Sequence, residues 1–210
     1  MNKKCTLIKE YLDEILPDAR CALNYSKDYE LVIAVMLSAQ TTDKAVNNVT
    51  INLFNKYKTL EDFANASLFD VEEEIKRLGM YKLKAKNIIG ICKNILENHG
   101  GIVPKEKELL TALPGVGVKT ANVVRAELFN IPEIAVDTHI LRISKRLALA
   151  LEGDGPLEAE QKLRKLFPEN LYIKLHHQLI WFGRTVCKAK NPDCENCQLK
   201  KFCKSVKKFK

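Results

Sequence analysis

The sequence predicts an all-α protein, and three observations support that fold class. Apolar residues recur at the 3.6-residue period of a helix along nearly the whole chain. No segment alternates convincingly at the two-residue period of a half-buried strand. Loop-forming glycine, proline and asparagine residues separate the helical segments at 100–101, 130–132 and 153–156.

Apolar stripes, capping residues and prolines predict where each helix begins and ends. The first stripe begins at Leu7 and ends at Pro17, because proline cannot continue a helix. Asp28 is a candidate cap for a helix that runs to about Ala39 and buries the longest apolar run, 31–37. A further helix is expected at 45–57, and two short helices should begin after the capping residues Thr59 and Ser67. The remaining helices are expected at 84–98, 106–113, 119–129, 138–149, 157–167 and 172–185.

Length and hydrophobicity bound the class of protein. The chain has 210 residues, enough for one large or two small domains with an apolar core, and 46% of them are hydrophobic. No apolar stretch approaches the roughly 18 residues of a membrane span. The first residues, Met-Asn-Lys-Lys-Cys-Thr-Leu, lack the apolar segment of a signal peptide, so the protein is expected in the cytoplasm.

The charge is strongly positive and unevenly distributed. The formal net charge is +8, and six lysines with no acidic residue follow from Lys200 to the end. Such a balance suits a polyanion, because each phosphate that is neutralised releases condensed counterions. A solvated surface that only aids solubility has the same composition, so charge alone leaves both interpretations open.

The cysteines indicate metal ligation. Three of the seven are scattered and are interpreted as thiols without function, namely Cys5, Cys21 and Cys92. The other four lie within seventeen residues, spaced Cys187-x6-Cys194-x2-Cys197-x5-Cys203. Four close thiolates can enclose a tetrahedral zinc ion or a [4Fe–4S] cluster. Zinc usually uses two Cys-x2-Cys pairs and only one exists here, so the spacing favours iron–sulfur without excluding zinc.

A glycine-rich turn at 113–120 separates two helical segments and reads Leu-Pro-Gly-Val-Gly-Val-Lys-Thr. Gly115 and Gly117 permit positive φ and close approach of a ligand. Backbone N–H groups around Val116 can then face outward at the start of the next helix, which forms an anion site for a phosphate. The alternative is a tight turn between helices that needs glycine only for its geometry.

The histidines are not assigned a catalytic role. His139, His176 and His177 fall in helical patterns, where packing or hydrogen bonding explains them, and His99 is expected in a loop. The stretch from Tyr172 to Phe182 is interpreted as a core stripe that leads into the cysteines.

With these motifs in place, the chain resembles a known family over nearly its whole length. Residues 113–121 resemble the helix–hairpin–helix signature of the DNA glycosylase superfamily, and Ala-Val-Asp-Thr-His-Ile at 135–140 resembles the segment that carries its essential aspartate. The 6-2-5 cysteine spacing matches the iron–sulfur branch, the endonuclease III family. The resemblance implies a two-lobed fold: a multi-helix domain at 21–132, with the helix–hairpin–helix at about 108–130, and a cluster domain of 1–20 plus 133–210, with a C-terminal [4Fe–4S] cluster loop at 187–203.

The resemblance assigns catalysis to Lys119 and Asp137. A lysine attacks the sugar C1′ only as a neutral amine, which burial under DNA, the helix dipole and neighbouring basic residues favour. A carboxylate favours the ammonium instead, so Asp137 is expected to stabilise positive charge on the sugar and to relay protons. The alternative for Lys119 is an exposed helix lysine without a catalytic role, and the alternative for Asp137 is a helix N-cap. A capping role for Asp137 is compatible with catalysis.

The resemblance also assigns DNA contacts. Gln40 matches the residue that inserts opposite the orphaned base, and Met80 stands where an apolar wedge, more often leucine, enters the stack. Val118 is a second departure, since many relatives carry a basic residue there. Gly115, Val116 and Gly117 would contact phosphate. Lysines of the cluster loop would position the duplex, above all Lys190, with Lys188, Lys200, Lys201 and Lys204.

The function implied is a bifunctional DNA glycosylase and abasic-site lyase of base excision repair. It would remove oxidised or damaged pyrimidines from duplex DNA and cut 3′ to the abasic site by β-elimination through a lysine Schiff base. A monomer that binds double-stranded DNA and no membrane is expected, in the cytoplasm and associated with the nucleoid. The rivals are a monofunctional glycosylase of the adenine-mismatch branch, which typically lacks this lysine, a non-catalytic DNA-binding or redox-sensing module, and an iron–sulfur electron carrier.

Overall fold

The computed structural model describes residues 1–206, and the described part of the chain is entirely helical, without a β-strand. The predicted all-α class is therefore confirmed. The terminal Lys207, Lys208 and Lys210 lie outside the described residues. The chain divides into two compact units, one formed by Ala22–Phe129 and the other by Met1–Cys21 together with the chain from Asn130 onward.

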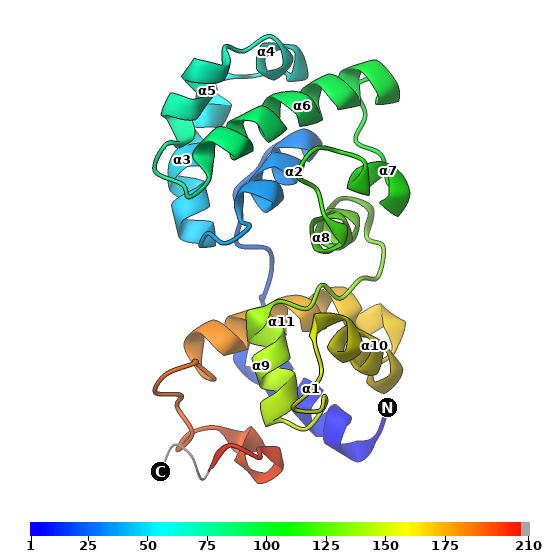
Figure 1. Ribbon diagram of the computed structural model, residues 1–210. Helices are drawn as coiled ribbons and strands as arrows, with labels where there is room; N and C mark the ends of the chain where they lie inside the picture. Colours follow the sequence, from blue (N-terminus) through cyan, green and yellow to red (C-terminus); the bar gives the residue numbers. More distant parts are fainter. Residues whose placement is uncertain (207–210) are drawn as a thin grey trace. The chain divides into compact units, whose positions relative to one another are not determined.

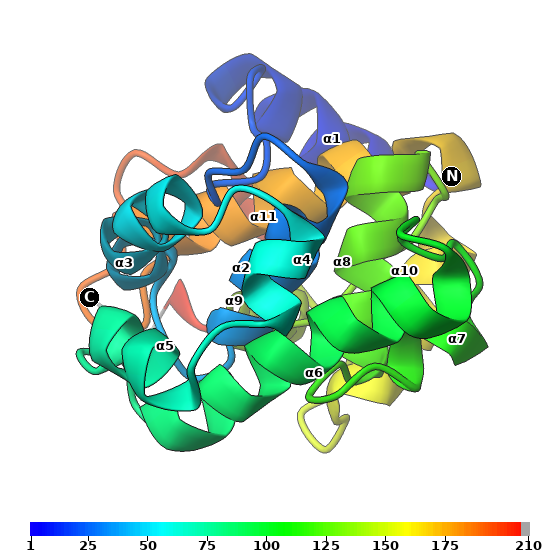
Figure 2. The same cartoon turned by 90° about the horizontal axis from the view of Figure 1, so that it is seen from above.

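The unit of residues 22–129 is built around one buried helix. Its helices are α2 (Asp28–Leu37), α3 (Asp43–Lys56), α4 (Leu60–Ala64), α5 (Leu68–Ile75), α6 (Tyr81–His99), α7 (Lys107–Thr111) and α8 (Val118–Phe129). The apolar run predicted to be buried forms α2, which contacts α3, α6 and α8 (Figure 1). The long helix α6 also packs against α4 and α5, which lie beside it in Figure 2. Helices α3, α4, α5 and α8 thus each pack against α2 or α6.

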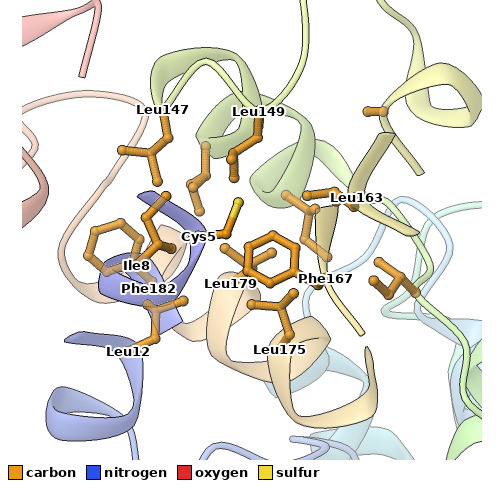
Figure 3. Packing of buried hydrophobic residues seen from close by; sticks show 14 of the residues in the cluster. Cys5, Ile8, Leu12, Leu147, Leu149, Leu163, Phe167, Leu175, Leu179 and Phe182 are labelled. Atoms are coloured by element: carbon orange, nitrogen blue, oxygen red, sulfur yellow. The ribbon is translucent and has the colours of Figure 1, made fainter. Parts of the chain in front are cut away.

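The second unit joins the N-terminal helix to the C-terminal part of the chain. Its elements are α1 (Lys3–Ile15), α9 (Thr138–Arg146), α10 (Pro156–Leu166), the 3-10 turn η1 (Glu169–Leu171), α11 (Tyr172–Thr185) and the 3-10 turn η2 (Gln198–Phe202). Side chains from α1, α10, α11 and the end of α9 meet in one apolar cluster, which includes Leu12, Leu163, Leu175 and Phe182 (Figure 3). Burial of these apolar surfaces is the main favourable term for this unit.

Several predicted helix ends were wrong. Helix α9 ends at Arg146 rather than at 149, because Ala148 takes a positive φ of 50° and the Leu149 and Ala150 N–H groups both donate to Ser144 O. His99 is the last residue of α6 and not part of a loop, since the left-handed backbone of Gly100 ends the helix only after it.

Helix α2 also departs from its predicted ends. Lys27 is its N-cap and Asp28 its first residue, and the helix ends at Leu37 instead of Ala39. The chain turns early because the Thr41 N–H donates to Ser38 O at 3.0 Å. Of the two short helices that follow, Thr59 caps α4 with its side chain as predicted, whereas Ser67 makes no side-chain capping bond to α5.

A charged network joins α1 to α11. Lys9 Nζ lies 2.5 Å from both oxygens of Asp13, and Lys174 Nζ and Gln178 Nε2 each lie 2.9 Å from Asp13 Oδ1. Burial by itself raises the pKa of Asp13, but the hydrogen bonds from Lys9, Lys174 and Gln178 outweigh it and hold this pKa well below its usual value.

We expect Asp13→Asn to destabilise the protein in a pH-dependent way. Because the pKa of Asp13 is depressed in the folded state, the carboxylate stabilises the fold fully above its ordinary pKa of 3.8, and this stabilisation is lost as the pH falls towards the folded-state value. The Asp13 side chain is 41% exposed, so solvent screens the network and the loss at pH 7 should be only about 1 kcal/mol. Chemical denaturation should show the difference at pH 7 and a smaller one at pH 3. The exposed Glu14→Gln on the same helix is the control, and an equal loss at both pH values would contradict the assignment.

Candidate functional site

The predicted glycine-rich turn joins α7 to α8, which pack against each other. The side chains of Leu113 and Val116 are buried, and the Val116 N–H donates to Leu113 O at 3.1 Å. Gly115 takes a positive φ of 72°, whereas Gly117 does not. The amide of Val116 is therefore engaged within the turn, and only one of the two glycines is needed for its backbone conformation.

The turn rests closely on α6. A Cβ atom at Gly115 would lie 2.2 Å from Asn87 Nδ2, and one at Gly90 would lie 3.0 Å from Pro114 Cγ. A Cβ atom at Gly117 would meet nothing within 4 Å. The missing side chain thus lets Gly115 approach α6, while at Gly117 it leaves the outer surface open.

Helix α8 begins directly after this turn. Its first backbone bond runs from the Ala121 N–H to Gly117 O at 2.9 Å, so the amides before Ala121 lie at the open end of the helix. Lys119 is exposed in this first turn, and the neighbouring Val118 is exposed as well. The arrangement offers an anion a set of N–H groups and the positive end of a helix dipole beside a free amine.

We expect alanine substitutions at the two glycines to affect stability differently. Gly115→Ala should lower the melting temperature by several degrees, because the new Cβ meets Asn87 and a left-handed backbone is strained for alanine. Gly117→Ala should leave the melting temperature within about a degree of the wild type, since its surroundings are open. Thermal unfolding of both variants checks this, and equal destabilisation would contradict the packing described for the turn.

Asp137 is the N-cap of α9 in the other unit. Its Oδ1 accepts a hydrogen bond from the Ile140 N–H at 2.8 Å, and the side chain is half-buried. The N-cap predicted for this residue is therefore present. This bond fixes the direction of the carboxylate at the beginning of the helix.

Helix α9 is held against α11 by a close contact. A Cβ atom at Gly183 would lie 2.9 Å from His139 Nδ1, and Arg142 NH2 donates to Gly183 O at 2.8 Å. His139 Nδ1 lies 3.2 Å from the same Arg142 nitrogen. His139 thus has the packing and hydrogen-bonding role expected of it, and the contact with α11 sets the position of the Asp137 cap.

The four clustered cysteines line one open pocket. Burial raises the pKa of the Cys194 and Cys197 thiols, and the other thiols of the group raise it further by charge repulsion. The four thiols thus lie around one pocket, where a bound cation would relieve the repulsion between their thiolates.

Two arginines of α9 hold the beginning of this loop, and sequence reasoning missed both. Arg142 NH2 donates to Cys187 O at 3.0 Å, while Arg146 NH1 lies 3.3 Å from Cys187 Sγ and donates to Lys188 O at 2.7 Å. Arg146 NH2 donates to Ala189 O at 3.2 Å. Their spacing of four residues, which puts both on one helix face, was the only signal available in the sequence.

The predicted insertion residues lie in the same unit as Lys119. Gln40 and Met80 are exposed, and both take a left-handed backbone with φ of 55° and 57°. Lys190 is exposed in the loop after α11. These positions are accessible to a ligand, and the contacts assigned to them stay predictions.

A family model for the HhH-GPD superfamily of base excision DNA repair proteins matches residues 33–169. The chain belongs to this superfamily. It is 45% identical over 206 residues to endonuclease III of Bacillus subtilis (strain 168), covering 98% of this chain and 94% of that protein. It is 42% identical over 209 residues to endonuclease III of Escherichia coli (strain K12), covering 99% of each.

Solved structures agree with these relatives. A trapped covalent intermediate of endonuclease III with DNA matches with a TM-score of 0.93 and 42% identity, covering 99% of each chain. A non-covalent complex of endonuclease III with DNA matches equally well, with a TM-score of 0.93 over 99% of this chain and 98% of that chain. A thermostable thymine-DNA glycosylase shares the fold, with a TM-score of 0.85 at 22% identity.

Proposed function

We propose that this chain is a DNA glycosylase and abasic-site lyase that removes oxidised or damaged pyrimidines from duplex DNA, with Lys119 as its nucleophile. One observation carries the assignment. An exposed lysine lies in the first turn of α8, directly after the glycine turn, in a chain that matches over 99% of its length a protein trapped covalently on DNA. A covalent intermediate needs a nucleophile, and a neutral lysine amine supplies one.

The reaction follows from the chemistry of the amine. The Lys119 Nζ lone pair attacks C1′ of the extruded nucleotide, and the bond from C1′ to the base breaks, so that the base leaves with the electron pair and takes up a proton. Opening of the sugar gives a Schiff base between Nζ and C1′. Loss of a proton from C2′ then expels the 3′ phosphate, which cuts the strand, and water hydrolyses the Schiff base to release the lysine.

Asp137 serves this reaction through its carboxylate. Positive charge develops on the sugar as the base departs, and a fixed carboxylate stabilises it. The hydrogen bond from the Ile140 N–H supports this role, because it orients the carboxylate before DNA binds. The same group relays protons during attack and elimination.

The proposed DNA contacts are made by residues that are exposed on the surface. Phosphate binds at the amides that begin α8, next to Gly115 and Gly117, whereas the Val116 N–H is already bonded to Leu113 O and takes no direct part. Gln40 fills the gap left by the extruded nucleotide, and Met80 enters the stack as an apolar wedge. An enzyme with these contacts works on chromosomal DNA and is therefore associated with the nucleoid.

The four cysteines, Cys187, Cys194, Cys197 and Cys203, fit a [4Fe–4S] cluster. They line one pocket, yet among the described residues no three metal-binding side chains are grouped as a single metal ion requires. The 6-2-5 spacing of the four cysteines along the chain, with a single Cys-x2-Cys pair, supports an iron–sulfur cluster over a zinc ion. When bound, the cluster supplies a rigid centre that fixes the loop. The loop lysines, Lys190 among them, then contact phosphates and position the duplex.

Borohydride trapping tests the nucleophile. The wild-type protein should form a covalent adduct with a duplex that carries an oxidised pyrimidine or an abasic site, and Lys119→Ala should form none. Asp137→Asn keeps an oxygen that accepts from Ile140, so we expect an unchanged melting temperature with a rate lower by about 10²-fold or more.

The exposed Lys93→Ala on α6 is the matched control and should form the adduct as the wild type does. An equal adduct from Lys119→Ala would move the nucleophile to another residue. A normal rate for Asp137→Asn would mean that the Asp137 carboxylate only caps α9 and has no role in catalysis.

The absorption spectrum tests the metal. The protein should be brown, with absorption near 400 nm and the iron content of a four-iron cluster, and Cys197→Ser should lose most of this absorption because a ligand is removed. Cys21→Ser, outside the group, should keep it. A colourless protein that contains zinc would overturn the iron–sulfur assignment.

A further inference from the structure

Lys84, in the first turn of α6, is a buried charge to which the proposed chemistry gives no task. It is only 3% exposed, and none of the ion pairs formed by the described residues includes it. Burial lowers the pKa of its ammonium. An uncharged side chain of similar length would fill this space without removing a charge from water. Lys84 therefore does something other than fill the core.

The hydrogen bonds of the Lys84 ammonium flank one predicted insertion residue. Its Nζ donates to Ala39 O at 3.1 Å and to Thr41 Oγ1 at 2.8 Å, on either side of Gln40. The turn is closed by the Thr41 N–H, which donates to Ser38 O at 3.0 Å. Gln40 itself takes a left-handed backbone that is unfavourable for a residue with a side chain, so surrounding contacts must hold it.

The backbone of Lys84 holds the other predicted insertion residue. Its N–H donates to Met80 O at 3.0 Å and closes the first turn of α6, with Met80 as the left-handed N-cap. Met80 is 51% exposed, and this backbone hydrogen bond anchors it at the beginning of α6. Lys84 thus bonds to both neighbours of Gln40 through its side chain and to Met80 through its amide.

We infer that Lys84 is a positioning residue that holds Gln40 and Met80 together, ready to enter the DNA stack. The inference rests on the proposed function, because the insertion roles of these two residues belong to it. Preorganisation of this kind removes the cost of ordering the two turns when DNA binds. It acts on extrusion of the damaged nucleotide and not on the bond-breaking steps at Lys119.

The test uses the full-length protein and a duplex with 2-aminopurine opposite an uncleavable abasic analogue. Insertion of Gln40 should unstack the 2-aminopurine and raise its fluorescence. Lys84→Met should reduce this rise at least five-fold, and Lys84→Arg should restore most of it. Thr41→Val, which removes one acceptor, should reduce it about two-fold. The exposed Lys86→Met on the same helix is the matched control and should behave as the wild type.

Kinetics should show that Lys84 affects extrusion of the damaged nucleotide and not the bond-breaking steps. Single-turnover excision of an oxidised pyrimidine should fall about ten-fold in Lys84→Met, while cleavage at a preformed abasic site should change less than two-fold. The melting temperature should not fall, because methionine fills the space. Lys84→Met added to Gln40→Ala should cost little beyond Gln40→Ala alone, since the side chain acts through Gln40.

Three results would overturn the inference: normal fluorescence with Lys84→Met, equal losses of excision, lyase activity and melting temperature, or a salt dependence of DNA binding reduced by about one phosphate contact. The last would mean that Lys84 binds DNA directly. A failure of the proposed function is distinguishable, because the wild type itself would then form no borohydride adduct.

Discussion

The first N–H groups of a helix have no partner within it, and the proposed chemistry depends on two such helix beginnings. Lys119 lies in the first turn of α8, where the partial positive charge of the helix attracts a phosphate. Asp137 caps α9, where the Ile140 N–H fixes its carboxylate. One property of helix geometry therefore provides an anion site beside the nucleophile and a carboxylate of defined direction.

Close packing decides where those helix beginnings lie. Gly115 lets the turn before α8 rest on Asn87 of α6, and Gly183 lets α11 approach His139, two residues after the Asp137 cap. A Cβ atom at either glycine would lie within 3 Å of its neighbour, so even the smallest side chain would shift a functional residue. Lys119 and Asp137 are thus each positioned by contacts inside their own unit, so residues that never touch DNA should affect activity.

Sequence patterns predicted what depends on neighbouring residues. The α11 bounds, the Asp137 cap and the spacing of the cysteines are local, because helix periodicity, capping and ligand spacing all act within a few residues. Contacts between distant segments could not be predicted in this way. Lys84 meets acceptors 45 and 43 residues earlier in the chain, and Arg146 reaches Cys187, 41 residues away. Apart from the four-residue spacing of Arg146 from Arg142, nothing local distinguishes these two cations from the many exposed ones, so their roles emerged from the fold.

The two buried cations and the exposed lysines have different electrostatic roles. Lys84 and Arg146 donate to backbone carbonyls inside the protein, where salt screens little. The phosphate contacts proposed for exposed lysines such as Lys190 act through counterion release, so they weaken steeply as the salt concentration rises. Because the internal geometry does not share this dependence, salt should lower the affinity for DNA without loosening the insertion turns or the cysteine loop. Binding and positioning can therefore be varied independently in one small, basic chain.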